Sequence, residues 1–361
     1  MNDASSGSTP AEWAFCHRIL PDVSRTFALN IPVLPPPLRD AVCCAYLLCR
    51  IADTIEDAPR LSAPARDGLY ARLRLALEES TDRAAPAPLP HDWTAGLPRG
   101  YAELVRGSRD VFAAFRGLPA PHRAAIADCV RDMIDGMQRL GRANAPPAPR
   151  VTADSNDAAE AVRFVCDDFS ALDDYCHCVA GTVGLMLTRL FRHELGDPPA
   201  LRGEPALERG RRFGLGLQTT NIIKDHHDDL RRGVCFVPPE CVRHGEPSLP
   251  LTEPGRVRLI RHALSHLDAA MDYVLCLPCD ATGVRLFCLW ALMLALGTLR
   301  EAAASPSPKI SRVEVAEILE TGRRLAADDD QLRAWFAELR GAVVAALESA
   351  ALRAAPCGAA P

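Results

Sequence analysis

The chain has 361 residues, of which 48% are hydrophobic and 24% charged, and its formal net charge is −5. These values are ordinary for a globular protein. They exclude a disordered chain, a collagen-like repeat and a strongly basic nucleic-acid binder. A chain of this length can bury a large core, including one that encloses a cavity.

Helical patterns run through almost the whole sequence. The clearest helix is predicted over residues 38–57, where apolar side chains recur at steps of three and four. Prolines precede and follow it, as is typical of helix ends. Further helices are predicted at 65–79, 99–115, 121–140, 158–192, 205–231, 254–275, 282–303, 312–325 and 328–354. The proline-rich stretches predicted to be loops are 84–98, 145–149 and 237–254. Strand patterns are almost absent, so the predicted fold class is all-α.

A single all-α domain is predicted over residues 1–361, with 1–12 and 355–361 as flexible tails. The most hydrophobic run, 286–299, contains no charged residue. It is shorter than the roughly 20 residues that a membrane-spanning helix needs. We therefore expect a buried core helix there and no transmembrane anchor.

The fourteen cysteines do not indicate a disulfide framework. Those inside apolar helical patterns are Cys43, Cys44, Cys49, Cys176, Cys178 and Cys288. In such surroundings a free thiol packs as a small hydrophobic group. No apolar signal segment opens the chain. These features predict a reduced protein located in the cytoplasm.

Two segments carry oxygen-bearing side chains at helical spacing. Asp53 and Asp57 are four residues apart, so they project from one face of the predicted helix, about 5–6 Å from each other. Asn221, Asp225 and Asp229 repeat the same spacing twice. Carboxylates side by side repel each other unless a cation neutralises them. Because Mg²⁺ prefers oxygen ligands and commonly joins carboxylates to a substrate phosphate, the two stripes predict a metal–diphosphate site.

Three other patterns have simpler explanations. Asp128 and Asp132 also share a helix face, but their polar neighbours predict a solvated surface. His226 and His227 are adjacent and point about 100° apart on a helix, which does not favour a joint zinc site. The single C-x-x-C at 276–279 has no second pair nearby, whereas structural zinc takes four ligands.

Four blocks follow one another along the chain. They are S-R-T-F at 24–27, D-T-I-E-D at 53–57, Y-C-H-C-V-A-G-T-V-G at 175–184, and Gln218 to Asp229 followed by Pro238. Over about residues 13–305 the chain resembles the head-to-head prenyl synthases, the family of squalene synthase, phytoene synthase and their relatives. The resemblance implies a single all-α domain of the isoprenoid synthase type, with helices packed around a central apolar cavity.

The blocks also contain subgroup signals. The motif Y-C-H-x-V-A-G, the segments 187–191 and 217–225, and Phe287 with Cys288 are most similar to squalene synthases. The segment T-V-G-L-M at 182–186 is closer to the phytoene and dehydrosqualene branch.

The resemblance assigns roles to the matching positions. The expected Mg²⁺ ligands are Asp53, Asp57, Asn221, Asp225 and Asp229. The expected diphosphate contacts are Ser24, Arg25, Arg50 and Lys224. Tyr175 matches a tyrosine that steers cationic intermediates, and Phe287 matches an aromatic residue that lines their path. The four aspartates, Tyr175 and Phe287 are the expected catalytic residues.

Two positions depart from the family pattern. The second motif usually ends in Glu-Asp, and here it ends in Asp228 and Asp229. We expect this to be tolerated because Asp229 is the predicted ligand. Val234 stands where many relatives carry an arginine, a phosphate contact that Arg231 or Arg232 could supply.

Several glycines superficially suggest a nucleotide-binding loop. They are Gly181, Gly184, Gly214 and Gly216. They lie within helical patterns and follow no strand, which excludes a Rossmann fingerprint. Their expected role is to let helices approach closely.

The resemblance implies that two farnesyl diphosphates condense to presqualene diphosphate, which NADPH then reduces to squalene with Mg²⁺ as the metal cofactor. No motif locates the NADPH site. The alternatives are a dehydrosqualene, hydroxysqualene or phytoene synthase, which omits the hydride transfer, and a non-catalytic helical scaffold. The expected partners are two substrate molecules and, peripherally, the inner face of a membrane that takes up the product. No nucleic acid is expected, and a monomer is favoured.

Overall fold

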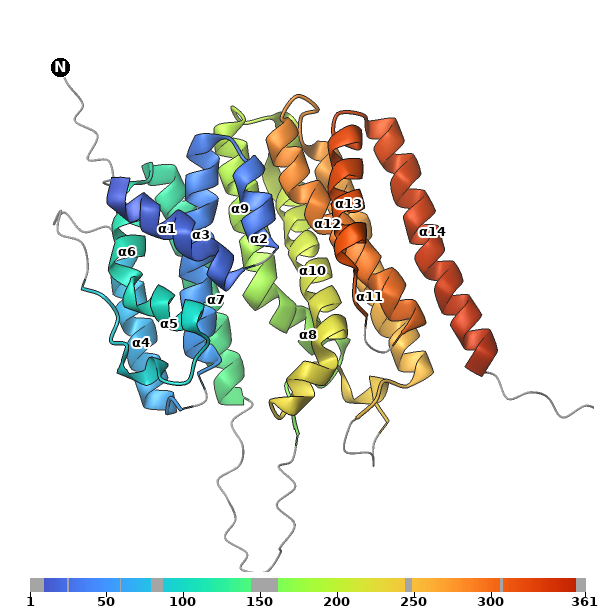
Figure 1. Cartoon of the computed structure of the whole chain (residues 1–361), viewed down its shortest axis with the longest axis horizontal. Coiled ribbons are helices and arrows are strands. Elements are labelled where there is room, and N and C mark those ends of the chain that lie inside the picture. The colour runs from blue at the N-terminus through green and yellow to red at the C-terminus, as the bar shows by residue number, and fades with distance from the viewer. Residues whose placement is uncertain are drawn as a thin grey trace, which may run out of the picture. The chain divides into compact units, whose positions relative to one another are not determined.

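The computed structural model describes residues 10–24, 26–58, 60–78, 87–143, 162–243, 249–305 and 308–354. Helices make up most of these residues (Figure 1). The one sheet in these ranges has two short strands, β1 (Arg163–Phe164) and β2 (Val234–Cys235), which pair in parallel. The predicted all-α fold class is confirmed.

The chain divides into two compact units. The first comprises Met1–Gln138 and Leu185–Arg202. Its α-helices are α1 (Pro10–Val23), α2 (Phe27–Asn30), α3 (Pro36–Glu56), α4 (Ala63–Ala76), α5 (Arg99–Arg106), α6 (Ser108–Gly117), most of α7 (Ala120–Ala143) and the end of α9 (Thr182–Glu194). Its short 3₁₀ turns are Ile31–Val33, Asp92–Thr94 and Pro199–Leu201.

The second unit comprises Arg139–Gly184 and Gly203–Pro361. Besides the strands and the start of α9, it contains α8 (Phe169–Cys176), α10 (Gly203–Arg231), α11 (Glu253–Cys276), α12 (Thr282–Ala304), α13 (Arg312–Leu325) and α14 (Asp329–Ala354). A π-helical turn at His177–Gly181 links α8 to α9, and a 3₁₀ turn lies at Pro239–Cys241. The single domain and its central cavity remain predictions.

Local sequence signals determine where several helices begin. Ser62, Thr252 and Ser311 precede α4, α11 and α13, and each hydroxyl accepts a hydrogen bond from a first-turn backbone N–H. Prolines occupy the first turn of α3, where their missing N–H costs no hydrogen bond. The helix predicted over 38–57 is confirmed, with its observed bounds at Pro36 and Glu56.

The single helix predicted over 99–115 is wrong. The chain forms α5 and α6 there, with a break at Gly107. The ring of Phe15 packs against the α-carbon of Gly107, where a side chain would overlap it. Phe15 belongs to α1, a helix that the sequence analysis does not predict although α1 buries Ile19 and Val23.

The continuous helix predicted over 158–192 is also wrong. Residues 163–164 form β1, and α8 begins only after Asp168, whose carboxylate accepts a hydrogen bond from the Ala171 N–H at 2.8 Å. The backbone N–H of Val165 donates to Cys235 of β2 at 2.9 Å. Pairing with a distant segment thus outweighs the local helical pattern. Residues 158–161 lie outside the described ranges.

The predicted tails are only partly covered by the structure. The N-terminal tail predicted over 1–12 is too long, because α1 begins at Pro10. Residues 1–9 and 355–361 lie outside the described residues. The same holds for residues 84–86 of the loop predicted at 84–98, and for the whole loop at 145–149.

The apolar run 286–299 lies in α12, as predicted. Within the described ranges, α12 is the one helix long and apolar enough to cross a membrane, and 78% of that apolar stretch is buried. The indole N–H of Trp290 donates to the Leu319 carbonyl of α13 at 3.0 Å. The prediction of a buried core helix is confirmed.

The cysteine prediction also agrees with the structure. All six cysteines that the sequence places in apolar helices are buried. The thirteen cysteines in the described part of the chain are free thiols. Burial raises the pKa of several of them, as for Cys43, whose pKa is about 12. These thiols therefore stay protonated and pack as hydrophobic groups.

Candidate functional site

The first aspartate pair lies at the C-terminal end of α3. Asp57 caps this helix, and its backbone N–H donates to the Asp53 carbonyl at 2.9 Å. The Asp57 side chain is exposed, whereas the side chain of Asp53 is only 27% exposed. The adjacent Ile51, Ala52 and Ile55 are fully buried. The pair therefore lies where the buried face of α3 meets the surface of the first unit.

Arg50 contacts both Asp53 and Tyr46, and Tyr46 in turn contacts the end of α1. Its Nη1 atom lies 3.5 Å from Asp53 Oδ2. Its Nε and Nη2 atoms donate to the Tyr46 hydroxyl at 3.3 and 3.2 Å. That hydroxyl donates to the Val23 carbonyl at 2.9 Å, next to Ser24, whose own hydroxyl accepts a backbone N–H from α2 at 3.0 Å. The structure thus brings the predicted residues Ser24, Arg50 and Asp53 together through Tyr46.

Two tyrosines of this cluster are absent from the sequence prediction. The guanidinium carbon of Arg50 lies 5.6 Å from the ring centre of Tyr46 and 5.7 Å from that of Tyr101. Both are cation–π distances. Tyr46 has the helical spacing of an apolar core residue, and Tyr101 lies on α5 with no motif around it. The sequence therefore carries no signal for either role.

The environment of Asp53 disfavours its negative charge. Burial and then the neighbouring charge of Asp57 raise the pKa of Asp53 to about 6, although Arg50 acts in the opposite direction. Near neutral pH the carboxylates of Asp53 and Asp57 repel each other in the metal-free protein, and a bound cation would offset this repulsion. The oxygen-only donors and this raised pKa fit Mg²⁺.

We expect the Asp53 carboxyl to contribute less to the stability of the metal-free protein as the pH rises from about 4 to about 7. A carboxyl group whose pKa is higher in the folded than in the unfolded chain stabilises the fold while it is protonated, and this contribution is lost as it ionises. A shift of about two units corresponds to at most ~3 kcal/mol. Asp53→Asn removes the charge and should be more stable than the wild type by about 1–2 kcal/mol at pH 8. Urea unfolding at pH 4 and pH 8 with a chelator measures the difference. Equal pH slopes for the two proteins would contradict the assignment.

The second motif lies along the C-terminal part of α10. Asn221 is exposed, Asp225 is half-buried, and Asp229 is buried with 6% of its surface exposed. The Lys224 ammonium lies 3.3 Å from Asn221 Oδ1 and 3.3 Å from Asp225 Oδ2. The ammonium of Lys224, a predicted diphosphate contact, therefore contacts both of the predicted ligands Asn221 and Asp225.

The two arginines that follow the motif pair with its carboxylates. Arg232 Nη2 lies 2.5 Å from Asp229 Oδ1, and Arg231 pairs with Asp228. Both arginine side chains are exposed. Basic groups are thus held beside the predicted metal ligand Asp229.

Val234, the departure from the family pattern, is part of β2. It is in register with Arg163 of β1, and the Arg163 N–H donates to the Gly233 carbonyl at 2.9 Å. Gly233 has φ +75°, a left-handed conformation that favours glycine. The exposed Arg163 therefore lies beside Val234, the position at which many relatives carry an arginine. Arg163 lies within the helix predicted over 158–192, so the sequence pattern gives no sign of this pairing.

The predicted aromatic residues lie on two different helices of the second unit. Tyr175 on α8 is half-buried, and its ring centre lies 4.7 Å from that of Phe236, with an angle of 33° between the ring planes. Phe236 directly follows β2 and is a further aromatic candidate that the sequence analysis missed. Phe287 on α12 is buried, with 4% of its surface exposed.

The π-helical turn after Tyr175 is packed against glycines. A Cβ atom on Gly214 of α10 would overlap the Ala180 carbonyl, and one on Gly184 of α9 would overlap the Gly210 carbonyl. This confirms that these glycines allow helices to approach closely. Single π turns inside helices are frequent at functional sites. Here the turn fixes the helix that carries Tyr175.

Arg25, His226 and Asp128 are further residues that the sequence singles out. Arg25 lies outside the described residues. His226 is buried and its Nε2 lies 3.0 Å from the Leu249 carbonyl oxygen, a hydrogen bond that accounts for this nitrogen. Asp128 is exposed, as expected for a solvated face. No residue is assigned to NADPH.

The aspartate motifs lie within a longer stretch of family similarity. Residues 20–319 match the squalene/phytoene synthase family. The chain belongs to this family. Its members are prenyltransferases, and the matched span contains both aspartate motifs, Tyr175 and Phe287.

Similar curated proteins carry the name squalene synthase. Squalene synthase BSS of Botryococcus braunii is 34% identical over 217 residues, which cover 60% of this chain and 40% of that protein. The squalene synthase of Solanum lycopersicum is 29% identical over 304 residues, which cover 80% of this chain and 64% of that protein. The alignments thus span between two fifths and two thirds of the relatives' own lengths.

Solved structures share the fold. TcSQS in complex with the ligand BPH1237 has a TM-score of 0.70 and 23% identity, covering 94% of this chain and 99% of that one. A dehydrosqualene synthase in complex with a ligand has a TM-score of 0.58 and 17% identity, covering 87% and 96%. At these identities the likeness establishes the all-α fold.

Proposed function

We propose that this chain condenses two farnesyl diphosphates head to head to presqualene diphosphate and then, with NADPH, converts this intermediate to squalene. One observation carries the proposal: each of the two helical aspartate motifs has a basic side chain within 3.5 Å of a carboxylate, namely Arg50 at Asp53 and Lys224 at Asp225. The names of the similar proteins support the choice of squalene.

The basic and hydroxyl side chains bind the diphosphates in this proposal. These are Ser24, Arg25, Arg50 and Lys224. Asp53 and Asp57 in the first unit, and Asn221, Asp225 and Asp229 in the second, would each hold Mg²⁺, which would supply Lewis-acid assistance to the loss of diphosphate. Arg163 provides the basic group that Val234 lacks, because the two positions are in register.

The allylic cation that remains after ionisation needs aromatic and apolar surroundings. The adjacent rings of Tyr175 and Phe236 and the buried ring of Phe287 stabilise it in our proposal, each by roughly 0.5–2 kcal/mol. The apolar core side chains exclude water, which would otherwise trap the cation as an alcohol. The double bond of the second farnesyl diphosphate attacks the cation, and proton loss then closes the cyclopropane of presqualene diphosphate. A second loss of diphosphate precedes the hydride transfer from NADPH.

A sibling activity is the second candidate. The segment T-V-G-L-M at 182–186 favours a synthase that omits the hydride transfer and forms dehydrosqualene, hydroxysqualene or phytoene. These activities share the first half-reaction with squalene synthesis. The same aspartates and basic residues therefore serve either candidate.

Product analysis tests the proposal. Purified protein is incubated with farnesyl diphosphate and Mg²⁺, with and without NADPH, and the extract is analysed by mass spectrometry. We expect squalene only with NADPH and presqualene diphosphate without it. A dehydro- or hydroxylated C30 product regardless of NADPH would assign the sibling activity. No product from this substrate or from a longer diphosphate would overturn the enzymatic proposal.

We further propose a cytoplasmic monomer that touches the inner face of a membrane peripherally when the hydrocarbon product leaves. The free, buried thiols support a reducing compartment. Cosedimentation with lipid vesicles in the presence of substrate tests the membrane contact. Protein that stays in the supernatant would contradict it.

A further inference from the structure

A second group of metal-binding side chains lies in the second unit, on α8 and α11. His262 and His266 are one helical turn apart on α11, and both imidazoles face Asp173 of α8. Their Nε2 atoms lie 2.7 and 3.1 Å from the same carboxylate oxygen, Asp173 Oδ1. The two Nε2 atoms lie 3.3 Å from each other. Three potential ligand atoms thus form a small, nearly regular triangle.

The size of this triangle matches one face of a transition-metal site. Zinc binds imidazole nitrogen and carboxylate oxygen at about 2.0–2.2 Å. Two such ligands are therefore about 2.9 Å apart at a right angle and about 3.3 Å apart at the tetrahedral angle. The observed separations of 2.7, 3.1 and 3.3 Å lie close to this range. Two histidines and one carboxylate are also a ligand set that zinc uses, with further positions left for water.

The cluster is partly shielded from solvent. The side chain of His266 is 7% exposed, that of His262 20%, and that of Asp173 32%. Burial raises the pKa of Asp173, but hydrogen bonds from the two imidazoles outweigh this and hold it below its ordinary value. The carboxylate is therefore charged and available as a ligand at neutral pH.

This site is separate from the second aspartate motif. His266 packs beside Gly216 of α10, where a Cβ on the glycine would lie 3.2 Å from His266 Cβ. Asn221, the nearest residue of that motif, is five residues from Gly216 in that helix, and Asp225 is nine residues away, which corresponds to about 7.5 and 14 Å along the axis. The donor types differ as well, because nitrogen ligands suit zinc or cobalt and all-oxygen sets suit Mg²⁺.

One neighbour works against a metal ion. Arg212 Nε lies 3.4 Å from His266 Nδ1, and its Nη2 donates to the Ser265 carbonyl at 2.5 Å. A metal-bound His266 carries its proton on Nδ1, which would then face another donor. The 3.4 Å contact is long and weak. Since Arg212 keeps its bond to Ser265, it can release the imidazole without leaving its place.

We propose that Asp173, His262 and His266 form a binding site for a divalent transition metal of the zinc class, which ties α8 to α11. Each imidazole binds the ion through Nε2 and keeps its proton on Nδ1, so both remain neutral. Asp173 is two residues from Tyr175 on the same short helix. The ion therefore holds the helix that carries this tyrosine.

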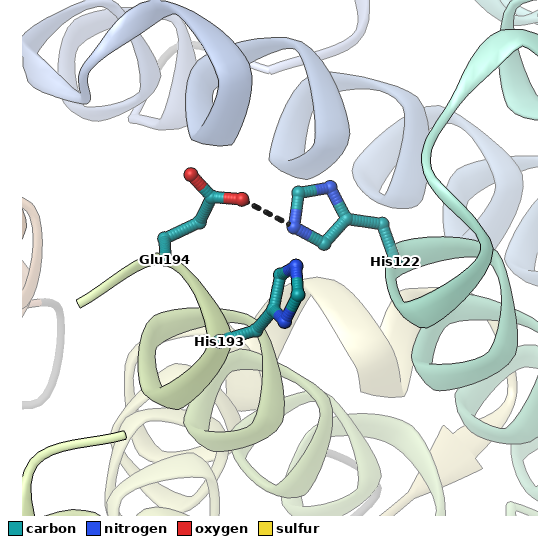
Figure 2. A group of neighbouring side chains, drawn as sticks. All are labelled: His122, His193 and Glu194. Atoms are coloured by element: carbon teal, nitrogen blue, oxygen red, sulfur yellow. Dashed lines mark ion pairs between the residues drawn. The ribbon is translucent and has the colours of Figure 1, made fainter. Parts of the chain in front are cut away.

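The first unit offers a natural comparison. His122 from α7 and His193 and Glu194 from the end of α9 also lie together (Figure 2). His122 Nε2 lies 2.8 Å from Glu194 Oε1, whereas the His122 and His193 rings meet edge to face with centres 5.3 Å apart. His193 is exposed. The three ligand atoms of this second cluster also lie within 4.8 Å of one another, so it is the alternative site that the test must separate from the first.

Cobalt binding tests the proposal independently of the enzymatic reaction. The full chain is freed of metal with a chelator, supplied with excess Mg²⁺ to fill oxygen-only sites, and titrated with Co²⁺ while visible absorption is recorded. We expect one equivalent to give the absorption of a nitrogen-ligated ion, and Zn²⁺ to displace it. His262→Gln and Asp173→Asn should each weaken binding at least tenfold, while His193→Gln, the control in the other cluster, should leave it unchanged. Arg212→Met should tighten it severalfold.

Melting curves and helix content establish that each variant is folded. Zn²⁺ should raise the melting temperature of the wild type and of His193→Gln, but not of folded His262→Gln. Loss of binding in His193→Gln with binding kept in His262→Gln would place the ion in the other cluster and overturn the proposal. Absence of a spectral change in the wild type, or weaker binding in Arg212→Met, would overturn it as well.

Discussion

Replacing Asp53 or Asp225 by asparagine is expected to lower kcat by at least about 100-fold, a loss at the upper end of that seen when a metal site's supporting residues are changed. Each side chain is a predicted Mg²⁺ ligand with a cation partner, Arg50 for Asp53 and Lys224 for Asp225. Asparagine keeps the size and one oxygen but removes the charge that holds Mg²⁺. The loss of charge should affect ionisation of the diphosphate more than substrate binding, because the arginine and lysine remain.

The measurement is steady-state formation of presqualene diphosphate at saturating substrate, over a range of Mg²⁺ concentrations. We expect both variants to remain impaired even at high Mg²⁺. Asp128→Asn is the matched control, since Asp128 is an exposed helical aspartate outside the motifs, and its kcat should equal that of the wild type. Activity within a factor of three of the wild type in either motif variant would contradict the metal-ligand assignment.

The fold of these variants should be intact, which separates a catalytic from a structural defect. Asp53→Asn relieves the unfavourable charge that raises the pKa of this residue to about 6. In the metal-free protein it should therefore be at least as stable as the wild type. An inactive but more stable variant is characteristic of a site where function requires an unfavourable arrangement of charges.

The parts of the site that could be predicted are those formed within one helix. Asp53 and Asp57, like Asn221, Asp225 and Asp229, are related by the four-residue period of α3 and α10, so their common face follows from the sequence. Arg50 and Lys224 lie within the same helices, but the family resemblance, and not the helical spacing, predicts their roles. The structure adds their contacts to the carboxylates.

The parts that could not be predicted depend on pairing between distant segments. Tyr101 reaches Arg50 from α5, and Phe236 reaches Tyr175 from the segment after β2. Arg163 stands beside Val234 only because residues 163–164 leave the helical pattern and pair with β2. The local periodicity of a sequence carries no information about such long-range contacts. It therefore predicts a helix at residues 163–164 and gives no functional role to Tyr101, Phe236 or Arg163.

The π turn is a further feature that a regular helical period hides. The sequence from 169 to 192 predicts an unbroken helix, yet His177–Gly181 is wound more widely. Such a turn adds a residue and rotates the side chains before it relative to those after it. Tyr175 lies before the turn and α9 follows it. The position of Tyr175 relative to α9 therefore depends on this turn, against which Gly214 of α10 packs.

Gly214→Ala is expected to destabilise the second unit by about 3 kcal/mol or more, because overpacking against rigid backbone lies at the upper end of the usual 1–3 kcal/mol. The new methyl group would overlap the backbone carbonyl of Ala180 within the π turn, which cannot move aside as a flexible side chain can. Gly341→Ala is the control: Gly341 lies inside α14 with nothing within 4 Å of its Cβ position. There alanine should stabilise the helix by up to about 1 kcal/mol.

Urea unfolding, followed by far-ultraviolet circular dichroism, compares the two variants with the wild type. The midpoint should fall for Gly214→Ala and stay equal or rise for Gly341→Ala. If Gly214→Ala still folds at low temperature, its product profile should change as well, since moving the turn displaces Tyr175 and lets water reach the cation, giving alcohols in place of hydrocarbon. A Gly214→Ala protein with the stability and the products of the wild type would mean that the turn yields easily. Tyr175 would then owe its position to its contact with Phe236 and not to the packing of α10 against the turn.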